Sequence, residues 1–114
     1  MPASSDLARL RLLLLQIRDE PEVEQQEQDC FVHFSGLAAE QFAFRNLVER
    51  PDLAPQDVRG FDAVVIGGAG AHSVTEEYPF TAPLAAAVET MVAARQPLFG
   101  SCWGHQFIAK ALGG

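Results

Sequence analysis

Apolar residues along this chain fall into short blocks that predict four β-strands. The run at residues 10–17 (LRLLLLQI) is almost continuously apolar and is closed by the polar stretch RDEP, so its length and flanks favour a buried strand over a helix. Residues 61–66 (FDAVVI) are apolar and β-branched and stop at GGAG, which makes them the clearest strand. Two shorter strands are predicted at residues 41–48 and 97–100. The aromatic residues whose period predicts a core position are Phe42, Phe44 and Phe61.

Three further segments have the spacing of helices, at residues 21–35, 81–94 and 103–112. Pro21 suits the first turn of the first helix, and Gly36 is a typical residue just after its end. The second helix is rich in alanine, and the third ends at a pair of glycines. These segments alternate with the strands along most of the chain.

This alternation predicts an α/β fold with a largely parallel sheet covered by helices on both faces. Residues 51–60 are predicted to form a loop with one short turn, and residues 71–79 a polar loop. Four strands are few for a doubly wound sheet, which usually has about five or more. We therefore expect residues 1–114 to be a single domain that is incomplete, truncated after the third helix.

Charge and composition exclude several classes of function. The chain has 8 basic and 15 acidic side chains and a net charge of −7, which argues against binding to nucleic acid or to an anionic membrane. No stretch approaches the ~20 apolar residues of a membrane span, and the first apolar run is too short for a signal peptide. The two cysteines, Cys30 and Cys102, form no disulfide framework, so we expect free thiols in the cytoplasm.

The chemistry of the chain is predicted at residues 99–106, FGSCWGHQ. Cys102 stands where a strand changes into a helix, with Gly100 and Gly104 two positions away on either side. Small residues at these positions prevent a clash between the strand and helix backbones, which is the logic of a nucleophile elbow. The elbow exposes the thiol at a helix N-terminus, whose partial positive charge favours the thiolate. The amide of Trp103 points to the same space and could donate to an oxyanion.

A cysteine in an apolar segment is more often a small buried hydrophobic residue than a nucleophile. The paired glycines and the change from strand to helix reverse that balance for Cys102. The turn GGAG has neither a Walker lysine nor G-x-G-x-x-G spacing, so nucleotide binding there is not expected. No metal site is expected among the acidic residues of the first helix, because none has a histidine or cysteine at ligand spacing. These residues are Glu22, Glu24, Glu27 and Asp29. Glu76 and Glu77 are predicted to lie in a solvated loop.

The segment FGSCWGHQFIAKALGG resembles the nucleophile segment of class I glutamine amidotransferases, whose pattern is G-x-C-x-G-x-Q. The matching residues are Gly100, Cys102, Gly104 and Gln106. Upstream, FDAVVIGGAGAHSV is similar to the strand and glycine turn of the family's oxyanion hole, with Ala69 where proline is commoner. Together with LLLLQIRDEPEV, these segments resemble the stand-alone, GMP-synthase-like members over residues 10–114. The resemblance implies a flavodoxin-like three-layer fold.

It also implies a glutaminase half-reaction that uses no metal and no cofactor. Cys102 would be the nucleophile, the amides of Gly68 and Trp103 would hold the oxyanion, and Gln106 would help to position the substrate glutamine. Ammonia would pass to an acceptor on a separate synthetase subunit or domain. Alternatives on the same fold are a γ-glutamyl hydrolase or peptidase, and an inactive binding or regulatory fragment.

The sequence departs from the family in one respect that matters for catalysis. The family completes its triad with a histidine and a glutamate in the pattern H-x-E, which does not occur in these 114 residues. His105 is expected to point away from the substrate, His72 to be a solvated loop residue, and His33 to lie on a helix face. We therefore expect the chain alone to have little or no glutaminase activity. Its uncovered surfaces would favour homo-oligomers.

Overall fold

The computed structural model of the protein describes residues 7–70 and 72–113, and its centre is a four-stranded sheet. The strands β1 (Leu12–Gln16), β2 (Phe42–Asn46), β3 (Ala63–Ile66) and β4 (Leu98–Gly100) are arranged in the order β2-β1-β3-β4. All three pairings are parallel, which confirms the predicted α/β class and its flavodoxin-like form. In the register of the sheet Ile66 lies beside Gly100, so β3 and β4 end at the same edge.

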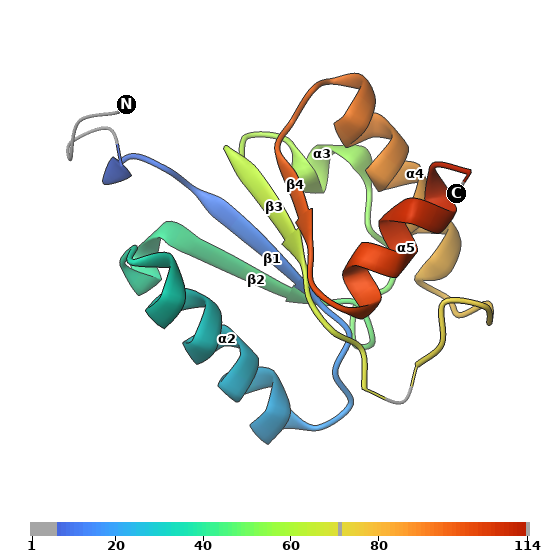
Figure 1. Ribbon diagram of the computed structural model, residues 1–114, viewed down its shortest axis with the longest axis horizontal. Coiled ribbons are helices and arrows are strands. Elements are labelled where there is room, and N and C mark those ends of the chain that lie inside the picture. The colour runs from blue at the N-terminus through green and yellow to red at the C-terminus, as the bar shows by residue number, and fades with distance from the viewer. Residues whose placement is uncertain (1–6, 71, 114) are drawn as a thin grey trace.

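The helices lie on both faces of this sheet, as Figure 1 shows: α2 (Pro21–Ser35) on one side, and α3 (Pro55–Val58), α4 (Thr81–Ala93) and α5 (Trp103–Ala111) on the other. A single 3₁₀ turn at Ala39–Gln41 precedes β2. The predicted limits of α2 are confirmed at both ends. Pro21 occupies its first turn, and Gly36 has φ 74°, the left-handed conformation that ends many helices.

The face that carries α4 and α5 holds the main hydrophobic core. Leu15 and Ile66 of the sheet are fully buried there, together with Leu84 and Met91 of α4. The aromatic rings of Phe80, Trp103 and Phe107 pack in sequence, with centroids 6.0 and 4.9 Å apart. We call this side, with α3, α4 and α5, the closed face.

The opposite side, which carries α2 alone, is the open face. Leu14 is fully buried on it, but no residue of α2 itself is buried. Phe34 of α2 is 83% exposed and Phe99 of β4 is 60% exposed. The prediction that Phe44 is a core residue is wrong, because β2 is an edge strand and the ring is only stacked on Phe42 while remaining 36% exposed. Phe42 is buried as predicted, and Phe61 is partly buried against the core.

Within the described ranges, no helix is long and apolar enough to cross a membrane. The same residues contain no group of three or more histidine, cysteine, aspartate or glutamate side chains placed to hold a metal ion.

Candidate functional site

The predicted nucleophile lies at the carboxyl end of the sheet, where β4 passes into α5. Cys102 is exposed and is the N-cap of α5. Its backbone has φ 51° and ψ −108°, a conformation that non-glycine residues rarely adopt. Strain of this kind costs on the order of 1–3 kcal/mol and persists only where the surrounding structure enforces it. The structure therefore contains the strained strand-to-helix turn that the sequence predicts.

Two glycines enforce this turn by close approach of backbone to backbone. A Cβ added at Gly100 would lie 2.5 Å from the carbonyl carbon of Gly104, and one added at Gly104 would overlap the carbonyl oxygen of Ile66. The amide of Ser101 donates to that same Ile66 oxygen at 2.9 Å, so the turn is also tied to β3. The first turn of α5 is thus pressed against the end of β3, and no larger side chain fits at either position.

The glycine turn that follows β3 leaves the sheet beside this elbow. The amide of Gly67 donates to the carbonyl of Leu15 at 3.1 Å, which continues the β1–β3 ladder by one residue. The amide of Gly68 donates to Glu27 Oε2 of α2 at 3.1 Å. Ala69, which stands where the family more often has proline, is buried. The predicted oxyanion donor therefore has a partner within the protein itself.

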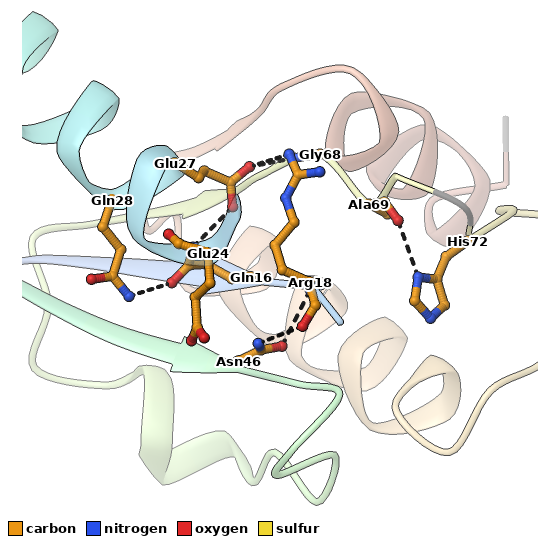
Figure 2. A network of polar contacts seen from close by, with 9 residues as sticks. All are labelled: Gln16, Arg18, Glu24, Glu27, Gln28, Asn46, Gly68, Ala69 and His72. Atoms are coloured by element: carbon orange, nitrogen blue, oxygen red, sulfur yellow. Dashed lines mark hydrogen bonds and ion pairs between the residues drawn. The ribbon is translucent and has the colours of Figure 1, made fainter. Parts of the chain in front are cut away.

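Glu27 is the centre of a polar network that the sequence did not predict (Figure 2). Its Oε2 also lies 2.7 Å from Arg18 Nη2, and its Oε1 accepts a hydrogen bond from Gln16 Nε2 at 3.1 Å. The Glu27 side chain is 8% exposed and that of Arg18 is 20% exposed. The one available signal was Gln16, a polar residue at the end of an otherwise apolar strand.

The rest of this network attaches α2 to the end of β1, and the segment after β1 to the end of β2. Gln16 is fully buried, donates to the carbonyl of Glu24 at 3.0 Å and accepts from Gln28 Nε2 at 2.8 Å. Asn46 Nδ2 donates to the carbonyl of Arg18 at 2.7 Å. Hydrogen bonds therefore hold α2 on the open face, where apolar packing is sparse.

Trp103, the predicted second oxyanion donor, has its side chain in the closed-face core and is 7% exposed. Its ring packs on Phe80 and Phe107. Its indole Nε1 is buried without a hydrogen-bond partner among the described residues. This packing holds the N-terminus of α5, including the backbone amide of Trp103, against the core.

The remaining predicted residues lie around the elbow in different surroundings. Gln106 is exposed one turn along α5, and its backbone amide donates to the Cys102 carbonyl at 3.2 Å. His105 and His33 are exposed on their helices. The prediction of a solvated His72 is wrong: its side chain is 14% exposed, its Nδ1 lies 3.0 Å from the Ala69 carbonyl, and its ring packs edge-on to Tyr78. The glycine turn folds back over the aromatic residues that precede α4, which removes His72 from water.

Two cavities flank Arg18 at this end of the molecule. The larger, of about 420 Å³, is lined by Arg18, Glu27 and Ser101 among other residues, and Cys30 and Phe34 form part of its wall. The smaller, of about 230 Å³, lies between Arg18 and the glycine turn at Ala69 and Gly70. Cys102 lines neither cavity and is open to solvent at the molecular surface.

Comparisons with known proteins agree with this geometry. The chain is 39% identical over 64 residues to one of the subunits of the glutamine-hydrolysing GMP synthase of Sulfolobus acidocaldarius, a match that covers 56% of this chain and 32% of that protein. The structure is similar to a glutamine amidotransferase from Methylobacillus flagellatus, with a TM-score of 0.65 and 25% identity over 90% of this chain and 39% of that one.

No family model matches the chain, and it spans only about two fifths of the solved amidotransferase and a third of the Sulfolobus protein. The relative found by sequence and the one found by structure are nevertheless both named as glutamine-using enzymes of this kind. The resemblance to class I, GMP-synthase-like glutamine amidotransferases is therefore confirmed, and the chain forms a glutamine amidotransferase-like domain.

Proposed function

We propose that this chain carries the nucleophile and oxyanion hole of a glutamine-hydrolysing site. The observation that carries the proposal is Cys102, exposed at the N-terminus of α5 in a strained conformation that two glycines make possible. Strained backbone conformations of this kind cluster at functional sites. The relatives, named for glutamine hydrolysis and amide transfer, support glutamine as the substrate.

In the proposed reaction the thiolate of Cys102 attacks the side-chain amide carbon of glutamine. A carbon–sulfur bond forms, and the electrons of the carbonyl bond move to oxygen, where the amides of Gly68 and Trp103 would stabilise the negative charge. Collapse of this intermediate breaks the carbon–nitrogen bond, and the nitrogen leaves as ammonia after taking up a proton. Water then cleaves the γ-glutamyl thioester to give glutamate and the free thiol. Gln106, one turn along α5, would help to position the substrate.

The proton transfers in this scheme need a base that these residues do not provide. No hydrogen bond to Cys102 Sγ is found among the residues that the structure describes, and His72 faces Ala69 and Tyr78. We infer that a histidine and a carboxylate come from further polypeptide, either continuous with this chain or in a partner subunit. The same proposal includes a synthetase that would accept the ammonia and a location in the cytoplasm.

The proposal can be tested with 6-diazo-5-oxo-norleucine, a glutamine analogue that alkylates an activated cysteine. The diazo carbon takes up a proton, sulfur forms a bond to it, and N₂ leaves. Cys30 is an exposed cysteine outside the elbow and serves as an internal reference. We expect mass spectrometry to find Cys102 labelled much faster than Cys30 by the analogue, by a larger ratio than iodoacetamide gives. Equal labelling of both cysteines by the analogue, in the native chain and in the Glu27 variants described below, would overturn the proposal.

A measurement of ammonia release tests the need for an additional base. We expect no detectable glutamine turnover by the 114-residue chain, since loss of proton transfer alone lowers a rate by ~10²–10⁴-fold. Turnover that disappears in Cys102→Ala would show that the chain is self-sufficient. Preferred cleavage of a γ-glutamyl peptide over glutamine would instead favour the hydrolase alternative.

A further inference from the structure

The carboxylate of Glu27 accepts a hydrogen bond from the amide on which the proposed oxyanion hole depends. Its Oε2 accepts the hydrogen bond of the Gly68 amide at 3.1 Å. A Cβ on the neighbouring Gly67 would lie 2.6 Å from the same oxygen, so the carboxylate is packed directly against the turn. An amide has one proton to donate. An oxyanion therefore cannot use the Gly68 amide while Glu27 remains in this position.

The position of the carboxylate is well determined by its other contacts. Arg18 Nη2 lies 2.7 Å from Oε2, and Gln16 Nε2 lies 3.1 Å from Oε1. With the side chain only 8% exposed, solvent weakens these contacts little. Figure 2 shows Glu27 directed from α2 toward Gly68 and the guanidinium of Arg18. The carboxylate thus sits at the turn as a bound anion would, held by three donors.

Two consequences for the reaction follow from its charge. A developing oxyanion would have to replace a charge-assisted hydrogen bond, which is stronger than a bond between neutral groups. It would also develop next to a like charge unless the carboxylate withdraws. We propose that Glu27 is a gate on the oxyanion hole: the site is closed while Glu27 accepts the Gly68 amide and opens when the carboxylate turns away. This inference rests on the proposed function of Cys102 and Gly68.

The structure has room for this movement beside the turn. Glu27 and Arg18 both line the cavity of about 420 Å³ that extends along α2 to Ser101. The carboxylate can rotate into this space with Arg18, which also borders the smaller cavity at Ala69. The backbone of the glycine turn need not move, because the Gly67 amide is anchored to the Leu15 carbonyl. The gate is therefore a side-chain event.

The experiment compares the rate at which diazo-oxo-norleucine labels Cys102 in the native chain and in variants of Glu27. Glu27→Gln keeps the size of the side chain and removes its charge, and Glu27→Ala removes the acceptor. Glu22→Gln makes the same change of charge in an exposed residue of the same helix and is the matched control. Iodoacetamide, a neutral alkylator that needs no oxyanion hole, reports the accessibility of the thiol in each variant.

We expect labelling of Cys102 by the analogue to rise about fivefold in Glu27→Gln, where a neutral acceptor remains, and more than about tenfold in Glu27→Ala, where the charge-assisted hydrogen bond is lost. Labelling of Cys102 by the analogue should stay at the native rate in Glu22→Gln, and the iodoacetamide rate of Cys102 should stay at the native value in every variant. Circular dichroism shows whether each variant is folded, and Glu27→Gln carries the test alone if Glu27→Ala does not fold.

The possible outcomes test the gate separately from the proposed function on which it rests. Unchanged or slower labelling in Glu27→Gln, with Cys102 still labelled faster than Cys30, would overturn the gate and leave the proposed function standing. If the analogue never distinguishes Cys102 from Cys30, in the native chain or in any variant, the proposed function fails and the gate fails with it.

Discussion

The two faces of the sheet hold their helices by different forces. On the closed face, α4 and α5 bury leucine, methionine and aromatic side chains, and Leu84, Met91 and Phe107 are almost inaccessible to water. On the open face, α2 buries none of its own residues and is held through Gln16 and Glu27. Apolar packing fixes the elbow at Cys102 from one side, and a directional polar network reaches the glycine turn from the other. The closed face is thus rigid, whereas the polar contacts on the open face can rearrange.

The largest effect is expected from a substitution at the tightest backbone contact of the closed face, between Gly104 and Ile66. Gly104→Ala places a methyl group into the carbonyl of Ile66, and we expect a loss of more than about 4 kcal/mol in the free energy of unfolding, measured by urea denaturation. Gly36→Ala, at the end of α2, meets no atom within 4 Å and should cost only about 1–2 kcal/mol through its φ of 74°. Equal losses in the two variants would mean that backbone contact is not what requires glycine at 104.

The second prediction makes one chemical change on each face. Phe107→Ala removes a ring that is 3% exposed, and its expected cost is about 3–5 kcal/mol in the free energy of unfolding. Phe34→Ala removes one that is 83% exposed and should change the same quantity by less than about 0.5 kcal/mol. A large loss in Phe34→Ala would show that α2 is packed against something in solution, and the contrast between the faces would then fail.

The third prediction concerns the strain at the elbow. Glycine adopts positive φ without the steric penalty of a side chain, so Cys102→Gly should raise the free energy of unfolding by roughly 1 kcal/mol while removing the proposed nucleophile. Cys102→Ala keeps the φ of 51° for a residue with a Cβ and should show no such gain. If Cys102→Gly is no more stable than the alanine variant, the turn is not strained in the native chain.

The smallest effect on stability is expected at the exposed ring of β4. Phe99→Lys should leave the unfolding free energy within about 0.5 kcal/mol but lower the average mass in sedimentation at high concentration, since Phe99 is 60% exposed on an apolar, uncovered face. Val92→Lys changes a 45% exposed residue of α4 and should not alter the mass. Equal reductions in both variants would indicate a general effect of charge.

Local signals explain which parts of the fold the sequence predicts. Pro21 and Gly36 delimit α2 because the proline ring fixes φ and glycine, without a Cβ, can adopt the left-handed φ of 74°. Gly100 and Gly104 mark the elbow because a Cβ at either position would meet backbone atoms. The contact between Glu27 and Gly68 joins residues 41 positions apart, and no local pattern encodes it. The exposure of Phe44 was missed because periodicity assigns a residue to one face of a strand without saying what covers that face.

The attachment of α2 by Gln16 also has a kinetic meaning. Water can replace the bonds that Gln16 makes to Glu24, Glu27 and Gln28, and detaching α2 uncovers less apolar surface than detaching α4 would. Local unfolding of α2 therefore requires less free energy than opening of the closed face. Glu27 leaves the glycine turn in that same event. Hydrogen–deuterium exchange of the α2 amides should then be faster than that of the α4 amides, and the Gly68 amide, which rotation of the Glu27 side chain also frees, should exchange at least as fast as those of α2.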